Sequence, residues 1–201
     1  MNKRRGLLVV FSGPSGSGKG TVLKAAMEKN DNIEVSISVT TRAPRNGEID
    51  GVHYIFYTNE QFEKLIAEDG FLEWAPFCDH YYGSPKERIE ALRNEGKDVI
   101  LEIEVQGAMK VKEACPEAVL IFNLPPSREE LKNRLVGRNT DSPEVIEKRL
   151  KTAEWEISQA KYYDYIIVNE VVEKTADAFL SVIESEKCKT ERNMNLLEEY
   201  K

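Results

Sequence analysis

Gly13-Pro14-Ser15-Gly16-Ser17-Gly18-Lys19-Gly20-Thr21 is the stretch of sequence that decides the fold of this chain. It follows an apolar run at residues 7–11, which predicts a buried strand, and it leads into residues 21–27, whose apolar side chains recur at helical spacing. A strand, a glycine-rich loop and a helix in this order are the context of a phosphate-binding P-loop. All residues of the stretch are therefore candidate phosphate-binding residues.

The residue types of this loop suit a phosphate group. Glycines let the backbone curl so that several N–H groups point at one anion, and the start of a helix adds a partial positive charge. Lys19 can reach the outer phosphates as a mobile cation. The usual pattern places a magnesium-binding Ser or Thr directly after the lysine, but here Gly20 comes first. Thr21 is therefore the candidate Mg²⁺ ligand, directly or through water. The alternative, an ordinary glycine-rich turn with a surface lysine, is disfavoured because both flanks fit.

The composition limits the class of protein and partner. A chain of 201 residues suggests one or two domains, and 41% hydrophobic with 31% charged residues is ordinary for a globular protein. The net charge of -7 argues against broad, sequence-independent nucleic-acid binding, which needs a basic surface. No apolar run approaches the length of a membrane span. The three cysteines lie far apart without metal or redox spacing, which fits a reducing cytoplasm.

Strands and helices alternate at both ends of the sequence, which predicts a parallel sheet with right-handed crossovers. The expected strands of this sheet are residues 7–11, 99–101, 118–122 and 165–168, and the expected helices are 105–115, 127–137, 143–161 and 171–186. Between them, strands at 33–38, 53–57, 71–75 and 79–83 predict a small mixed sheet inserted between about residues 34 and 95, with helices at 60–66 and from Ser84-Pro85 onward. The segment 39–48, rich in hydroxyl groups and cations, is expected to be a loop.

A second group of candidate residues lies in and beside that loop. It consists of Ser38, Arg42, Arg45 and Tyr54. An arginine presents a planar fork of donors that binds phosphate bidentately, and two arginines beside a hydroxyl group make a phosphate clamp. A second anion site beside a P-loop suggests phosphate transfer between two phosphorylated molecules. The alternative is that both arginines are solvated surface charges.

Five motifs occur here in the order in which guanylate kinases carry them. They are residues 13–21, Thr40-Thr41-Arg42-Ala43-Pro44-Arg45-Asn46-Gly47-Glu48, Glu73-Trp74, Tyr81-Tyr82-Gly83-Ser84 and Leu101-Glu102-Ile103-Glu104-Val105-Gln106-Gly107-Ala108. From about residue 7 to residue 186 the chain resembles a bacterial-type guanylate kinase. Five motifs at matching spacing are far more specific than the P-loop alone.

The resemblance implies an α/β fold with the architecture of the P-loop nucleoside monophosphate kinases. This architecture is a central parallel sheet flanked by helices, with an inserted small mixed β-sheet that binds GMP and a helical lid. Within one guanylate-kinase-like unit, the P-loop core would comprise residues 1–33, 96–126 and 155–201. The GMP-binding region would comprise residues 34–95, and the lid residues 127–154.

The implied activity is that of an ATP:GMP phosphotransferase, which gives ADP and GDP and recycles GMP in purine nucleotide metabolism. The resemblance assigns the phosphate of GMP to Ser38, Arg42, Arg45, Tyr54 and Tyr82. It implies that Glu73 and Glu104 accept hydrogen bonds from guanine N1–H and the 2-amino group, with Ser84 near O6. Adenine has an acceptor at N1 and no 2-amino group, so it would leave the carboxylates unpaired. Many family members carry Asp at the position of Glu104.

For the phosphoryl donor, the resemblance implies that ATP with Mg²⁺ binds residues 13–21 and that Asn169 contacts the adenine. Arg134, Arg138 and Arg149 of the lid would be catalytic together with Lys19, because phosphoryl transfer needs charge stabilisation more than covalent chemistry. Lid closure would also exclude water. The second pKa of a phosphate monoester is about 6, so no general base is required at neutral pH.

Three rival functions stay open at this point. They are a non-catalytic peptide-binding module of the kind found in scaffold proteins, a kinase for another monophosphate, and a P-loop regulatory switch. Lys19 and the arginines argue against the first, Glu73 and Glu104 argue against the second, and the third would need a guanine-reading loop that the sequence does not show. We expect ATP and GMP as partners, no nucleic acid, no membrane and a cytoplasmic location. Whether the chain forms a homo-oligomer is left open.

Overall fold

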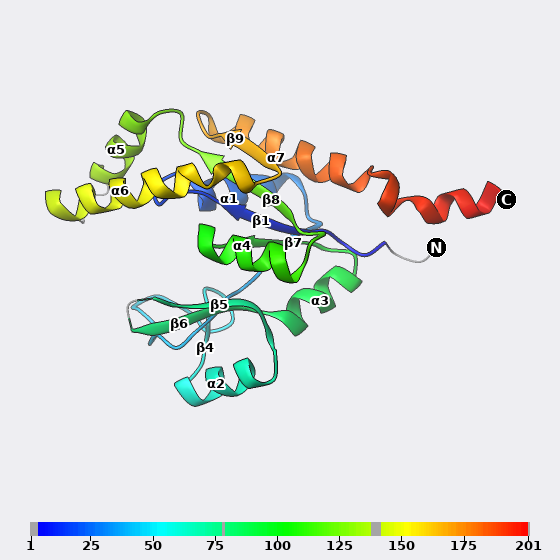
Figure 1. Cartoon of the computed structure of the whole chain (residues 1–201), viewed down its shortest axis with the longest axis horizontal. Coiled ribbons are helices and arrows are strands. Elements are labelled where there is room, and N and C mark those ends of the chain that lie inside the picture. The colour runs from blue at the N-terminus through cyan, green and yellow to red at the C-terminus, as the bar shows by residue number, and fades with distance from the viewer. Residues whose placement is uncertain (1–3, 78, 138–141, 201) are drawn as a thin grey trace. The chain divides into compact units, whose positions relative to one another are not determined.

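The computed structural model describes residues 4–77, 79–137 and 142–200 (Figure 1). The chain forms two compact units: Met1–Ser12 with Asn32–Leu120, and Gly13–Asp31 with Ile121–Lys201. The predicted order of strand, glycine-rich loop and helix is confirmed, because strand β1 spans Leu8–Ser12 and helix α1 spans Lys19–Lys29.

The first unit contains three parallel strands, β1, β2 (Ile33–Val35) and β7 (Asp98–Glu102). Strand β7 pairs with both of the others, with Ile100 opposite Val9 on one side and opposite Val35 on the other. The apolar residues of β1 and β7 are buried, as is usual for central parallel strands. Helices α3 (Lys86–Asn94) and α4 (Val105–Ala114) pack against β7 and β1, respectively.

The same unit contains the small mixed sheet, in the order β4-β3-β6-β5. Its strands are β3 (Val39–Thr40), β4 (Ile55–Phe56), β5 (Phe71–Phe77) and β6 (His80–Pro85). Strand β3 pairs with β4 in parallel and with β6 antiparallel. Helix α2 (Asn59–Ala67) lies beside this small sheet (Figure 1). It begins at a capping box made by Thr58 and Gln61, and its Phe62 packs into the sheet's apolar cluster. The expected mixed sheet is therefore confirmed, except that the strand expected at 33–38 does not belong to it, because residues 33–35 pair in parallel with β7.

Several local predictions for this unit are wrong. The segment 39–48 does not consist of loop alone, because Val39 and Thr40 are buried and pair with β6. The helix expected from Ser84 begins at Lys86, since Ser84 and Pro85 still belong to β6. The strand expected at 53–57 is confined to Ile55–Phe56, and the imidazole of His53 accepts a hydrogen bond from the Ile49 N–H in the preceding turn. In each case, pairing with a distant segment decides the element.

The second unit contains the parallel pair formed by β8 (Val119–Leu124), from Ile121 onward, and β9 (Tyr165–Val168), with Phe122 opposite Ile166. Helix α7 (Val172–Lys187) packs beside α1 and against β9 (Figure 1). Short 3₁₀ helices η1, η2 and η3 span Ala160–Tyr162, Thr190–Arg192 and Met194–Tyr200. Nowhere in the described parts of the chain is a helix both long enough and apolar enough to cross a membrane.

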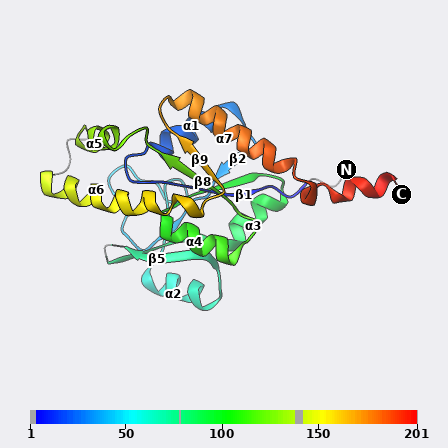
Figure 2. The ribbon, with the colours of Figure 1, turned by 45° about the horizontal axis from the view of Figure 1, so that its top comes forward.

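Helices α5 (Arg128–Val136) and α6 (Pro143–Ser158) make up most of the described part of the predicted lid (Figure 2). Their N-termini are capped by the side chains of Ser127 and Ser142, and Pro143 is the first residue of α6, as the sequence predicted. The two helices share a small apolar core of their own. That core consists of Leu131, Leu135, Leu150 and Ala153.

Candidate functional site

The glycines of the predicted P-loop occupy conformations that other residues rarely adopt. Gly13, Gly16 and Gly18 have φ angles of 149°, 91° and 86°. Space is also restricted, since a Cβ atom at Gly13 would lie 2.3 Å from the Asn123 carbonyl oxygen. A Cβ atom at Gly18 would lie 2.6 Å from the Asn169 amide nitrogen. The loop therefore requires glycine both for its backbone conformation and for its close packing.

The start of α1 provides donors for an anion. Gly18 is the N-cap of the helix, and no side chain caps the N–H groups of the first turn. The Lys19 ammonium donates to the Gly13 carbonyl at 2.7 Å and to the Pro14 carbonyl at 3.4 Å, so it lies over the loop. Gly20 and Thr21 are exposed on the first turn of the helix. A phosphate group placed at this loop would meet oriented N–H groups and one mobile cation.

The carbonyl oxygen of Ser17 is the point where the loop is attached to the rest of the second unit. The side-chain amide of Asn123 on β8 donates to it at 2.9 Å, and that of Asn169 donates at 2.7 Å. Arg134 on α5 donates from Nη1 at 3.4 Å. Three side chains from separate segments therefore hold one peptide group of the P-loop.

Of the predicted lid arginines, the structure brings Arg134 to the P-loop. Its other nitrogens donate to Glu130 Oε1 at 2.8 Å and to the Asn169 carbonyl at 3.0 Å. Arg149 is half-buried on α6, and Arg138 lies outside the described residues. The Asn169 side chain is buried, with its Oδ1 accepting from Thr175, so both ends of its amide have partners. The predicted contact of Asn169 with adenine stays a prediction.

In the first unit, Arg42 lies at the centre of the predicted phosphate clamp. Its Nη1 and Nη2 donate to the two carboxylate oxygens of Glu48 at 2.9 and 2.8 Å, and the Arg45 backbone N–H donates to Glu48 at 2.7 Å. The Arg42 guanidinium also lies 5.4 Å from the centre of the Tyr54 ring, which contacts the Tyr82 ring edge-on. Arg42, Tyr54 and Tyr82 are thus brought together.

Arg42 and Glu48 stabilise each other's charged forms. The hydrogen bonds from Arg42 and from the Arg45 backbone lower the pKa of Glu48 to about 2, and the bond with Glu48 raises the pKa of Arg42. The pair therefore stays ionised at neutral pH. The Arg45 side chain is exposed, and within the described residues it makes no hydrogen bond or ion pair. Ser38 is half-buried just before β3, and its carbonyl accepts from the Ile55 N–H at 2.9 Å.

The predicted base-reading residues are arranged unequally. Glu73 on β5 is buried and accepts a hydrogen bond of 2.7 Å from the Ser84 hydroxyl on β6. Burial raises the pKa of the Glu73 carboxyl, while the Ser84 hydroxyl and the Lys110 ammonium oppose this shift. A Cβ atom at Gly107 of α4 would lie 3.0 Å from Glu73 Oε2. Glu104, the N-cap residue of α4, is exposed.

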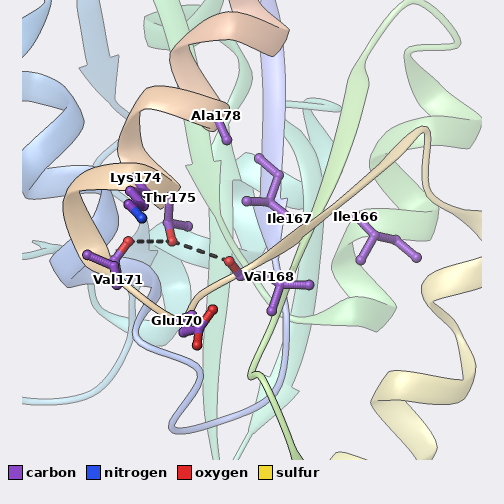
Figure 3. A pocket seen from close by; sticks show the side chains of 8 residues that line it. All are labelled: Ile166, Ile167, Val168, Glu170, Val171, Lys174, Thr175 and Ala178. Carbon is purple, nitrogen blue, oxygen red and sulfur yellow. Dashed lines mark hydrogen bonds between the residues drawn. The ribbon is translucent and has the colours of Figure 1, made fainter.

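The described residues contain no group of three or more His, Cys, Asp or Glu side chains that could hold a metal ion. The second unit does contain a pocket of about 460 Å³ between β9 and the start of α7 (Figure 3). The Thr175 hydroxyl lies beside it, 2.9 Å from the Val171 carbonyl and 3.3 Å from the Val168 carbonyl. Among the described residues that line this pocket, none is a predicted site residue. They are Ile166, Ile167, Val168, Glu170, Val171, Lys174, Thr175 and Ala178.

Two residues that organise the site were missed by sequence reasoning. Glu48 was part of a quoted motif, but its pairing with Arg42 was not predicted, although an acidic residue six positions after an arginine in a short turn is a usable signal. Asn123 lies just after the strand predicted at 118–122 and received no role. It is the polar residue in an otherwise apolar run, which could have marked it.

Comparison with known proteins gives one consistent result. The family model described as guanylate kinase matches residues 5–186. Guanylate kinases of Caldanaerobacter subterraneus subsp. tengcongensis and Clostridioides difficile are 51% and 52% identical to this chain, each over 96% of it and over 94% and 95% of their own lengths. A crystal structure of guanylate kinase from Anaplasma phagocytophilum is similar with a TM-score of 0.78 and 38% identity, covering 98% of this chain and 96% of that one.

Proposed function

This chain belongs to the guanylate kinase family, and we propose that its residues divide the transfer of a phosphoryl group from ATP to GMP between two half-sites, one in each unit. The expected α/β fold with parallel strands and a small mixed sheet agrees with this membership. The observation that most favours an enzyme over a non-catalytic binding module is the P-loop, whose glycines have the backbone conformations of a phosphate-binding loop and whose Lys19 lies over it.

The half-site for GMP lies in the first unit. The phosphate of GMP is held by Ser38, Arg42, Arg45, Tyr54 and Tyr82. The hydrogen bonds with Glu48 already fix the orientation of Arg42. The Glu73 carboxylate accepts from guanine N1–H and the 2-amino group, and the Ser84 hydroxyl keeps that carboxylate in place. Glu104 shares these donors with Glu73, so that the two carboxylates accept from N1–H and the 2-amino group on the same edge of the base. A purine without these donors leaves a buried carboxylate unpaired, which is the physical basis of selection.

The half-site for ATP lies in the second unit. Residues 13–21 surround the phosphates, and Lys19 exchanges its contacts with the loop carbonyls for contacts with phosphate oxygens. Arg134, with Arg138 and Arg149, neutralises charge that develops on the transferred group. An ionised oxygen of the GMP phosphate then attacks the γ-phosphorus in line, and ADP leaves. The lid over residues 127–154 excludes water from this step.

Magnesium enters this proposal together with ATP. The described residues contain no group of three or more His, Cys, Asp or Glu side chains that could hold a metal ion, so the ion would be held mainly by phosphate oxygens and water. The exposed Thr21 hydroxyl at the start of α1 is the protein group that would hold it, directly or through water. Bound in this way, Mg²⁺ would supply charge neutralisation of the phosphate groups. ATP and GMP are the partners in this proposal, which includes no nucleic acid or membrane and places the enzyme in the cytoplasm.

The proposal is tested by measuring ADP production from ATP and Mg²⁺ with GMP, AMP, UMP or no acceptor. We expect turnover with GMP alone. Turnover with another monophosphate would keep the kinase but overturn the roles of Glu73 and Glu104. A folded protein that binds GMP and shows no turnover with any acceptor would instead be a binding module.

A further inference from the structure

We infer that Asn123 is a positioning residue for the P-loop, which fixes one of its peptide groups through the Ser17 carbonyl and so directs a neighbouring N–H group at the phosphates of the donor. The inference rests on the proposed binding of ATP to this loop. It concerns a residue of β8 that is completely buried and therefore does not itself reach the nucleotide.

Asn123 is unfavourable for the stability of the fold at its position. The strand Val119–Leu124 is otherwise apolar and almost entirely buried. Burying a side-chain amide costs free energy unless its hydrogen bonds are made, and here the Oδ1 atom has no partner among the described residues. The Nδ2 atom, by contrast, makes two contacts, with Ser17 O at 2.9 Å and Ser17 Oγ at 3.2 Å. Both hydrogen bonds that the Asn123 amide group donates therefore go to one residue of the P-loop, Ser17.

The geometry of the peptide bond gives this contact a consequence for anion binding. In a planar trans peptide, the C=O and N–H groups point in opposite directions. Fixing the Ser17 carbonyl towards β8 therefore points the Gly18 N–H away from it. Within the described residues no hydrogen bond takes that N–H, and it directly precedes the uncapped first turn of α1. Asn123 acts on the phosphate-binding face by holding the opposite side of the same peptide.

The other donors to the Ser17 carbonyl have different roles. A carbonyl oxygen has two lone pairs, and the two asparagine amides make the shorter contacts, at 2.9 and 2.7 Å. Arg134 is the third donor, at 3.4 Å. With the peptide held by Asn123 and Asn169, Arg134 can leave the carbonyl for a phosphate group without releasing the loop. The asparagines provide the fixed support, and the arginine provides the exchangeable contact.

The test is Asn123→Leu, which keeps the branching of the side chain and removes the donor. ATP affinity is measured by titration of the enzyme without GMP, and GMP affinity and thermal stability are measured in parallel. We expect the Kd of ATP to rise about 3- to 10-fold, the loss of one neutral hydrogen bond, with GMP affinity unchanged. The melting temperature should not fall, because the substitution also removes an unpaired buried oxygen. Asn32→Leu is the control, since it removes an amide that donates to Gly96 O at 3.0 Å in the first unit.

A second variant, Asn123→Ala, cannot overpack and should give the same loss of ATP affinity if the leucine variant does not fold. Unchanged ATP affinity in a folded variant would overturn the inference, as would an equal loss of ATP and GMP affinity. Wild-type enzyme that binds ATP but phosphorylates no GMP would overturn the proposed function, while the comparison of ATP affinities would still decide the role of Asn123. Wild-type enzyme that binds no ATP would overturn both.

Discussion

The carboxylate of Glu48 accepts hydrogen bonds from both terminal nitrogens of Arg42, at distances of 2.8 and 2.9 Å. The side chains are 17% and 12% exposed, so this is a largely covered pair rather than a surface contact. Glu48 also accepts a hydrogen bond from the Arg45 backbone N–H, so it stabilises the turn that contains both arginines. Glu48 either orients Arg42 for binding the phosphate of GMP or competes with that phosphate for Arg42. We predict that it orients Arg42.

The substitution Glu48→Gln separates these two roles. The amide keeps the shape of the side chain but loses the charge that orients Arg42, so we expect the KM for GMP to rise about 10-fold, with the KM for ATP unchanged. Steady-state kinetics with each substrate varied in turn provide the measurement. Glu68→Gln, at an exposed ion pair on the end of α2, is the matched control. A lower KM for GMP in Glu48→Gln would identify Glu48 as a competitor and contradict the prediction.

The raised pKa of Glu73 predicts a pH dependence of GMP binding. An acid with a raised pKa takes up its proton earlier as the pH falls, and a protonated carboxyl presents a donor to the guanine N1–H. The KM for GMP should therefore rise between about pH 8 and about pH 5 more steeply in the wild type than in Glu73→Gln. The glutamine cannot titrate, so the difference between the two profiles isolates Glu73 from the titration of GMP itself, whose phosphate pKa is about 6. If the KM for GMP changed with pH equally in the two proteins, protonation of Glu73 would not affect GMP binding, and the prediction would be contradicted.

The pair Gly18 and Gly47 offers a direct test of why the P-loop needs glycine. Both have a φ angle of 86°, but a Cβ atom would meet Asn169 at 2.6 Å at the first and nothing within 4 Å at the second. Gly47→Ala should cost about 1–2 kcal/mol of unfolding free energy from backbone strain alone. Gly18→Ala should cost at least about 1 kcal/mol more, because it also displaces the Asn169 amide. Urea unfolding measures both variants, and equal losses would contradict the packing argument.

The role of Lys19 is tested by Lys19→Ala. We expect kcat to fall about 100- to 1,000-fold, as when one charge-stabilising donor is removed, while GMP binding changes little. Lys24→Ala, at an exposed lysine of the same helix, should retain normal turnover. The same loss is predicted for Arg138→Ala. Near-normal turnover in Lys19→Ala would show that the phosphate role is wrongly assigned.

Sequence reasoning succeeded where the signal is local. The strand at residues 165–168 has the bounds expected from its apolar run, and α6 begins at residue 143, where the sequence predicted it. It failed where a distant partner decides. Val39 and Thr40 become a strand because β6 pairs with them, which nothing in residues 39–48 reveals.

The same limit applies to the site. The P-loop and the arginine motif could be found from spacing, because each is a continuous string. The bond between Glu73 and Ser84, and the convergence of Asn123, Asn169 and Arg134 on Ser17, join residues from separate elements. Such contacts depend on the tertiary fold, so the sequence could name several of these residues but could not pair them.

The central claim is that a guanine-reading carboxylate selects the acceptor of this kinase. The most direct measurement is kcat/KM for GMP and for AMP in the wild type and in Glu73→Gln. We predict that the wild type prefers GMP by about 10⁴-fold or more, and that the substitution lowers kcat/KM for GMP about 10- to 100-fold while AMP remains a poor substrate with little change. An unchanged preference for GMP in a folded Glu73→Gln enzyme would contradict the account.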